Sequence, residues 1–191
     1  MIVWLNGTFG AGKTTTAHEL TATLSDARLF DAEQVGYMLR HALTSVRVTD
    51  FQDHPPWRAL VVATARELLD YLGGTLVIPQ TVLVERYWAE ISAGLAAAGI
   101  PVRHFVLHTD RATLVRRIET DTKEESAGAL QWRMDHLTPY EEALPWLSRA
   151  AEVVDTTHTP PAEVARHVAG RLGRVPGPPN VASANSNRAV D

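Results

Sequence analysis

The chain has 191 residues, of which 45% are hydrophobic and 21% are charged, and its net charge is −4. A chain of this length and composition can bury one substantial core, so we expect one domain. The net negative charge and the lack of a basic stripe argue against a nucleic-acid-binding protein. The absence of cysteine excludes disulfides, thiolate metal sites and thiol catalysis.

We expect no export signal at the N-terminus. Only Met1 precedes the first apolar run, IVWL, and this run is far too short for a signal peptide or a membrane span. The lack of cysteine fits a reducing compartment. We therefore expect a cytoplasmic protein without stable membrane insertion, as a monomer or a homodimer.

Apolar runs bounded by turn residues alternate with helix-period segments, which is typical of a parallel sheet with crossover helices. Strands are predicted at residues 2–5, 28–30, 75–78, 103–107 and 152–154. Helices are predicted at residues 13–24, 32–42, 57–72, 85–98, 111–119, 129–137 and 162–172.

A glycine-rich turn, GTFGAGKT, follows the first predicted strand. Gly7, Gly12, Lys13 and Thr14 satisfy the GxxxxGK[ST] pattern between a strand and a helix. Such a turn directs backbone N–H groups and a helix N-terminus at one point, where they bind phosphate. Lys13 would reach the β- and γ-phosphates of ATP, and Thr14 would ligate Mg²⁺. The predicted ATP-binding residues are Gly7, Thr8, Phe9, Gly10, Ala11, Gly12, Lys13, Thr14 and Thr15.

Two rival interpretations of this turn fail. A dinucleotide fingerprint requires a glycine where the chain has Thr15. A motor or switch NTPase has an acid at the end of a neighbouring hydrophobic strand, whereas here TLVI runs into Pro79 and Gln80. Asp110, after FVLHT, is the remaining candidate, but we favour its role as a helix N-cap. We therefore predict an α/β P-loop fold, a three-layer sandwich with about five parallel strands, helices on both faces and a small lid.

Asp31 follows the second predicted strand. Because the C-terminal ends of parallel strands form the ligand crevice, Asp31 should lie near Lys13 and Thr14. We predict that Asp31 is the catalytic base, contacts the substrate and helps Thr14 hold Mg²⁺. Alternatively, Asp31 caps the helix that begins at residue 32, and one carboxylate could do both. Glu33 could join through Mg²⁺-bound water, but we favour an ordinary first-turn glutamate.

Residues 119–128, ETDTKEESAG, form a polar acidic segment that is either a mobile lid or a solvated loop. Arg116 and Arg117 precede it and Arg133 follows it. Arginine provides the paired donors that suit phosphoryl oxygens, so we assign catalytic roles to Arg117 and Arg133 in a lid over residues 119–138. The alternative is that these arginines are solvated helix ends.

Substrate contacts are assigned to Asp31, Arg40, Trp57 and Arg58. The last two belong to DFQDHPPWR, residues 50–58, where Trp57 offers a flat apolar wall or else belongs to the core. Residues 153–161, VVDTTHTPP, could surround the adenine, and Thr159 is expected to cap the following helix at Pro160.

We place the P-loop kinase-like domain at residues 1–173. The remaining residues, 174–191, are rich in Pro, Asn and Ser and predict a disordered polar tail.

With the glycine turn, Asp31 and DFQDHPPWR, the chain resembles the TmrB-type tunicamycin-resistance proteins. These are AAA-like small P-loop ATP-binding proteins related to chloramphenicol phosphotransferase, shikimate kinase and the nucleoside monophosphate kinases. The resemblance covers residues 2–172 and rests on WLNGTFGAGKT, FDAEQVGYMLR, HPPWR, LVIPQT and VRHFVL. It implies ATP binding and, in some members, protection against a nucleoside antibiotic. Members can carry a C-terminal segment suited to membrane contact, whereas this tail is polar.

Two functional hypotheses follow. The first is a small-molecule kinase that uses ATP and Mg²⁺ to phosphorylate a hydroxyl of a nucleoside- or antibiotic-type acceptor, and so could confer tunicamycin-like resistance. The second is an ATP-dependent protein that sequesters such a molecule without transferring phosphate. A nucleic-acid-directed ATPase is disfavoured by the net charge and the missing strand-end acid.

Overall fold

The computed structural model describes residues 1–121 and 128–173. The predicted tail at 174–191 and the centre of the predicted lid, residues 122–127, lie outside the described residues.

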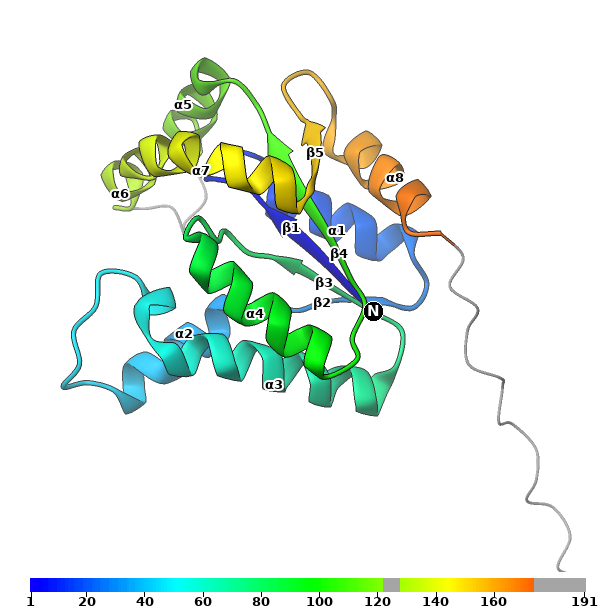
Figure 1. Cartoon of the computed structure of the whole chain (residues 1–191). Coiled ribbons are helices and arrows are strands. Elements are labelled where there is room, and N and C mark those ends of the chain that lie inside the picture. Colours follow the sequence, from blue (N-terminus) through cyan, green and yellow to red (C-terminus); the bar gives the residue numbers. More distant parts are fainter. Residues whose placement is uncertain (122–127, 174–191) are drawn as a thin grey trace, which may run out of the picture.

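The described chain forms one sheet of five parallel strands, ordered β2-β3-β1-β4-β5 (Figure 1). The strands are β1 (Ile2–Asn6), β2 (Ala27–Leu29), β3 (Thr75–Pro79), β4 (Val102–His108) and β5 (Glu152–Asp155). This arrangement confirms the predicted α/β fold with its five-stranded parallel sheet. Because β1 lies between β3 and β4, the loop that follows it opens at the middle of the sheet edge, where doubly wound folds bind ligands.

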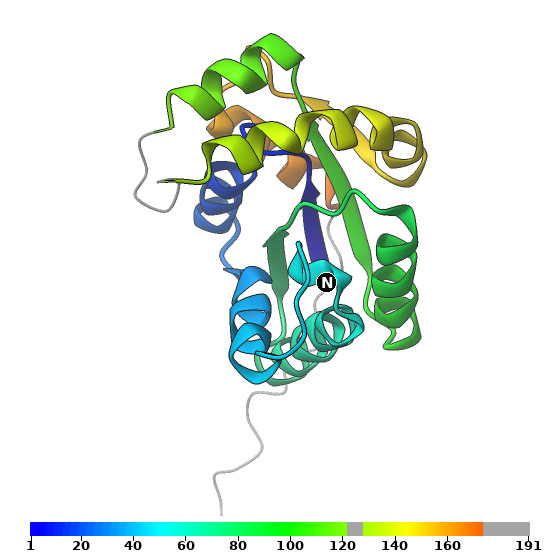
Figure 2. The ribbon, with the colours of Figure 1, turned by 90° about the vertical axis from the view of Figure 1, so that its left-hand side faces the viewer.

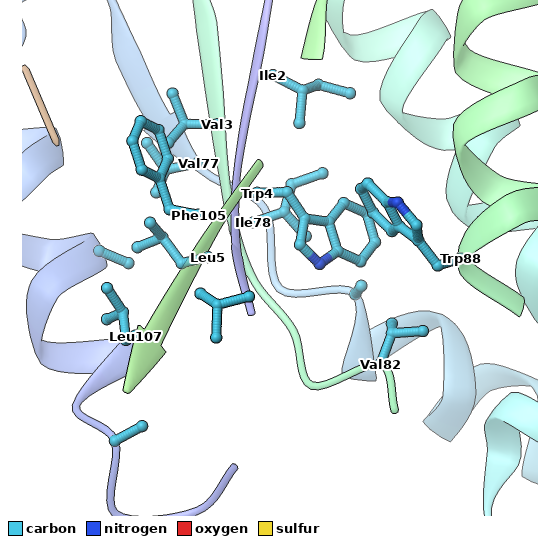
Figure 3. Close-up of a cluster of buried hydrophobic side chains, with 14 of the residues drawn as sticks. Ile2, Val3, Trp4, Leu5, Val77, Ile78, Val82, Trp88, Phe105 and Leu107 are labelled. Atoms are coloured by element: carbon cyan, nitrogen blue, oxygen red, sulfur yellow. The ribbon is translucent and has the colours of Figure 1, made fainter. Parts of the chain in front are cut away.

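The sequence of β1, IVWLN, explains its central position, since every residue in it is buried. A strand covered by helices on both faces has no polar face, and its side chains alternate between the two layers. Figure 3 shows Ile2 and Trp4 on the side of Trp88, and Val3 and Leu5 on the opposite side. Trp4 packs edge-on against Trp88, with ring centroids 5.1 Å apart.

Helices cover both faces of the sheet (Figures 1 and 2). They are α1 (Lys13–Thr23), α2 (Glu33–Ala42), α3 (Pro55–Leu72), α4 (Glu85–Ala97), α5 (Arg111–Glu119), α6 (Leu130–Asp135), α7 (Leu137–Ala150) and α8 (Pro161–Arg171), with a 3₁₀ turn, η1, at Phe51–Asp53. Helices α1 and α8 pack together on one face, and α3, α4 and α7 lie on the other. In residues 1–121 and 128–173, no helix has the length and apolar character needed to cross a membrane.

Helix α7 is absent from the sequence-based prediction. Its interior Pro145 removes one backbone hydrogen bond and normally ends a helix, so the pattern LTPYEEALPWLSRA gives a weak helical signal. The helix persists because its apolar stripe is buried against the sheet and α4. That stripe consists of Leu137, Tyr140, Ala143, Trp146 and Leu147.

The carboxyl end of β1 is held by a buried amide. Asn6 Oδ1 accepts hydrogen bonds from the backbone N–H groups of Gly7 (2.8 Å) and Val82 (2.9 Å), and its Nδ2 donates to Val82 O (2.9 Å). The same Nδ2 lies 3.4 Å from His104 Nε2 on β4. Asn6 therefore ties β1 to β4 and to the segment after β3 at the start of the glycine turn.

His104 is kept in its neutral form by burial, and its contacts fix which ring nitrogen carries the proton. Its Nδ1 lies 3.2 Å from Ala150 O, which can only accept, and its Nε2 faces the Asn6 amide, which donates. The ring also stacks on Trp88, with centroids 3.9 Å apart. Burial lowers the pKa of His104 from 6.5 to about 4, against a smaller opposing effect of the Ala150 carbonyl.

We expect this histidine to make the fold acid-sensitive. Between pH 6.5 and about 4 the unfolded chain binds a proton that the folded chain rejects, so stability falls as the pH is lowered through this window. The loss should approach about 3 kcal/mol. His104→Phe should flatten this slope, measured by urea unfolding across the window. A variant with the wild-type slope would show that another group causes the acid sensitivity.

Candidate active site

The glycine turn between β1 and α1 has a backbone that other residues would strain. Gly7 has φ 132°, and a Cβ there would lie 2.5 Å from Leu107 O on the neighbouring strand. Gly12 has φ 92° and faces open space, since a Cβ there would meet nothing within 4 Å. Gly7 therefore permits close packing on β4, and Gly12 bends the chain into α1 beside an open volume.

The start of α1 has several backbone N–H groups without an acceptor. The first intrahelical bond is Thr16 N–H to Gly12 O (2.9 Å). Within the described residues, the N–H groups of Gly12, Lys13, Thr14 and Thr15 have no acceptor, and the helix has no capping side chain or first-turn acid. Unsatisfied donors at a helix N-terminus bind anions, so this turn fits a phosphate group.

Lys13 folds back over the turn. Its Nζ donates to Thr8 O (3.0 Å) and lies 5.4 Å from the centroid of the Phe9 ring. Burial lowers the pKa of Lys13 to about 8, with Glu33 raising it and Arg133 lowering it to smaller extents. Because this ammonium is poorly solvated, an anion beside it would recover much of the lost interaction.

A cavity of about 1120 Å³ opens above the turn. Most of the residues predicted for the site line it: Phe9, Gly10, Ala11, Gly12, Lys13, Thr14, Thr15, Asp31, Arg40, Arg117 and Arg133. Gly7 and Thr8 lie buried beneath it. The volume exceeds that of a single small-ligand pocket, so it can hold a nucleotide and a second molecule.

Asp31 lines this cavity and also caps a turn. Its Oδ1 accepts from Glu33 N–H (2.9 Å) and its Oδ2 accepts from Gln34 Nε2 (2.9 Å). These bonds fix the carboxylate on the wall that it shares with Lys13 and Thr14. The N-cap of α2 is Ala32 and not Asp31, so the predicted cap is displaced by one residue. The carboxylate can still act as a base, because each oxygen keeps a further lone pair.

The two predicted lid arginines make different contacts. Arg117 donates to Thr156 O (2.8 Å), Gly10 O (3.2 Å) and Thr157 O (3.4 Å), so it joins the glycine turn to the segment after β5.

The predicted cap at Thr159 is displaced by one residue, because Pro160 occupies the N-cap of α8.

Arg133 lies on the other side of the cavity. It pairs with Asp121 at 2.7 Å, which ties together the two ends of the predicted lid, and its guanidinium lies 5.5 Å from the Phe9 ring centroid. Trp132 and His136 also pack on Phe9, at centroid distances of 4.8 and 5.3 Å. Helix α6 therefore covers the glycine turn.

A family model described as AAA domain matches residues 2–132, more than half of the chain. The chain belongs to this AAA domain family. No curated protein matches the sequence.

Solved structures with the same fold as this AAA domain include kinases and a resistance protein. The tunicamycin resistance protein of Deinococcus radiodurans is 25% identical, with a TM-score of 0.68 over 90% of this chain and 95% of that one. A sugar kinase from a Janibacter species is 17% identical (TM-score 0.64; 88% and 92% covered). The APS kinase of Mycobacterium tuberculosis, in complex with AMPPNP and APS, is 21% identical (0.58; 88% and 95%). The AAA domain therefore has the fold of P-loop kinases.

Trp57 and Arg58 do not line the cavity of this AAA domain, contrary to their assignment as substrate contacts. Trp57 is fully buried, and its Nε1 donates to Ala32 O (3.1 Å). Arg58 pairs with Glu90, donates to Gln52 O and lies 4.2 Å from the ring centroid of Tyr87. Pro55 and Pro56 start α3 in an orientation that buries the side chains of Trp57 and Arg58.

Two further acids lie on the cavity wall of the AAA domain: Glu33, which we expected to be an ordinary first-turn glutamate, and Asp50, which was not assigned from the sequence. Burial raises the pKa of Glu33, which Asp31 raises further and Lys13 lowers. Burial also raises the pKa of Asp50, which accepts from Gln52 N–H at the start of η1. The signal for Asp50 was the sequence DFQD, in which Asp50 and Asp53 have the spacing of a capping box. This spacing does not reveal that the cap faces a cavity.

The metal assignment rests on Thr14 and Asp31, which line the same cavity. Within the described part of the AAA domain, no three His, Cys, Asp or Glu side chains are grouped as a metal site. Mg²⁺ in phosphoryl-transfer enzymes keeps several waters and uses one or two protein ligands plus phosphate oxygens, so one hydroxyl and one carboxylate fit such an ion.

Proposed function

We propose that the protein is a kinase that transfers the γ-phosphate of ATP to a hydroxyl of a small molecule. The observation that carries this proposal is the shared cavity, which is lined by the turn with its unsatisfied N–H groups, by Lys13 and by Asp31. A simple ATPase needs no second compartment, whereas this cavity has room for an acceptor beside ATP.

ATP would lie with its β- and γ-phosphates on the N–H groups of Gly12 to Thr15 and beside Lys13. The segment after β5 would border the adenine, because Thr156, Thr159 and Val164 line the cavity next to Gly10 and Arg117. Arg117 shapes this wall through its bonds to main-chain carbonyls. We therefore assign it a positioning role here instead of contact with the γ-phosphate.

The transfer would use Asp31 as the base. The acceptor hydroxyl gives its proton to a carboxylate oxygen of Asp31, its oxygen forms a bond to the γ-phosphorus, and the bond to the β-γ bridging oxygen breaks to release ADP. Mg²⁺ held by Thr14 and Asp31 would neutralise the phosphate charge, and Arg133 lies on the wall where the γ-phosphate oxygens would be. Most of the rate enhancement would come from positioning and charge neutralisation.

The likeness to the Deinococcus tunicamycin resistance protein supports a nucleoside- or antibiotic-type acceptor, and phosphorylation would then give resistance. The same likeness favours one alternative, an ATP-dependent protein that binds such a molecule without phosphorylating it.

The experiment is incubation of the full chain with ATP, Mg²⁺ and a panel of nucleosides, sugars and antibiotics, with products detected by mass. We expect one compound to gain a phosphoryl group, and a parallel Lys13→Met preparation controls for contaminating kinases. ADP formation without any phosphorylated product across the panel would contradict the kinase and support the binding protein.

A further inference from the structure

A small recess opens beside the main cavity, on the side away from the adenine wall. It measures about 20 Å³, close to the space that one water molecule needs. Its walls include Glu33, Asp50, Phe51, Thr81 and Trp132, all of which also line the main cavity. A ligand in the main cavity could therefore place one small group, such as a hydroxyl or an amine, in the recess.

Gln80 lines this recess, and the oxygen of its side-chain amide is unpaired. The side chain is 2% exposed, and its Nε2 donates to Thr81 O (3.2 Å). A carbonyl oxygen only accepts, so this bond fixes which end of the amide is the nitrogen. Its Oε1 is buried and has no partner among the described residues. A buried acceptor without a donor costs free energy, which a ligand donor would recover.

Three side-chain donors around the recess already have acceptors. Gln52 Nε2 donates to Thr81 O (2.9 Å), the Thr81 hydroxyl donates to Gly7 O (2.8 Å), and His136 Nδ1 lies 2.6 Å from Trp132 O. The groups that remain for a ligand are three acceptors, Gln80 Oε1 and the carboxylates of Glu33 and Asp50, and one donor, the indole N–H of Trp132. The recess therefore suits a hydrogen-bond donor.

The charges at this end of the cavity point the same way. Asp31, Glu33 and Asp50 all line it, and Arg40 is the cation on the same α2 side. Lys13 and Arg133 lie over Phe9, which also lines the recess, but neither cation lines the recess itself. A carboxylate or phosphate placed in the recess would lie beside the carboxylates of Glu33 and Asp50, whereas an amine would be attracted to them.

We propose that the acceptor is an uncharged or amine-bearing polyhydroxylated ring, and that one of its donor groups binds Gln80 Oε1 in the recess. Phe51 and Trp132 provide flat apolar walls for the ring beside these polar groups. Acceptors that carry a carboxylate or a phosphate are rejected at this subsite. This inference rests on the proposed kinase function and names its substrate class.

The test uses the full chain and matched acceptors that differ in charge. Glucose, glucosamine, glucuronate and glucose 6-phosphate form one set, and uridine, 5′-amino-5′-deoxyuridine and uridine monophosphate form a second. Phosphorylated products are measured by mass, and kcat and KM are determined for each acceptor and for ATP. We expect products from neutral or amine-bearing members, with kcat/KM at least about tenfold higher than for the anionic members of the same set.

Two variants test the residues. Gln80→Met removes the unpaired oxygen and should raise the acceptor KM by roughly tenfold, without changing the KM for ATP. Asp50→Asn keeps an N-cap side chain but removes one charge, and should shift the preference towards anionic members by several-fold. Gln131→Met, on the exposed side of α6, is the matched control and should leave every value unchanged.

The outcomes separate this inference from the proposed function. Products from anionic members alone would overturn the inference and leave the kinase intact. ADP without any phosphorylated member would overturn the kinase and the inference with it. If neutral members react and Gln80→Met folds but keeps the wild-type KM, Gln80 has no part in recognition. If Gln80→Met fails to fold, an unchanged charge preference in Asp50→Asn overturns the proposal.

Discussion

An Asp31→Asn variant is expected to lose about 10²- to 10⁴-fold in kcat while it still binds ATP, because it removes the proton acceptor and leaves the phosphate-binding turn intact. The substitution is nearly isosteric. Its Oδ1 can still accept from Glu33 N–H, so the start of α2 should persist. The measurements are kcat with the best acceptor, and ATP affinity by calorimetry in the presence of Mg²⁺.

The control for this prediction is Asp155→Asn. Asp155 also ends a strand and accepts from a backbone N–H two residues later, Thr157 (2.7 Å), but it is exposed and lies outside the cavity. It should therefore keep full activity. If Asp31→Asn retains its turnover, Asp31 is only a cap and the base lies elsewhere. If instead ATP affinity is lost together with turnover, its main role is to hold Mg²⁺.

The central features of the fold follow from local sequence signals. The run IVWLN before GTFGAGKT could only be a strand buried on both faces that leads into a glycine turn, and the structure has this strand in the middle of the sheet. Parallel strands place their carboxyl ends on one edge, so the meeting of Asp31 with Lys13 and Thr14 was predictable from chain order.

The rest depends on contacts between distant segments, which residue order does not reveal. Trp57 and Arg58 looked suitable for a substrate, yet their orientation is set by contacts with Ala32, just before α2, and with Glu90 on α4. Gln80 was noticed only as the residue that replaces a strand-end acid. Its Oε1 is unpaired because the amide nitrogen donates to Thr81 O, which fixes the orientation of the side chain. The position of Thr81 O follows from the turn after β3.

Lys13→Met should weaken ATP binding by about 10- to 100-fold and abolish measurable transfer. Charged hydrogen bonds to phosphate are each worth about 1.5–3 kcal/mol, and Lys13 is the charged side chain in the phosphate-binding turn. The substitution should not destabilise the unliganded protein. Burial already lowers the pKa of Lys13 to about 8, so the fold gains little from this charge before an anion arrives.

The two halves of this prediction need separate measurements. Calorimetric titration gives ATP affinity, and urea unfolding without nucleotide gives stability. Arg103→Met, which removes an exposed cation of β4 outside the cavity, is the control and should change neither quantity. A Lys13→Met protein that binds ATP normally would contradict the assignment of the turn as the phosphate site. A large loss of stability without nucleotide would mean that the bond from Lys13 to Thr8 O holds the turn together. Lys13 would then have a structural role in the free protein, instead of being a desolvated charge positioned to bind phosphate.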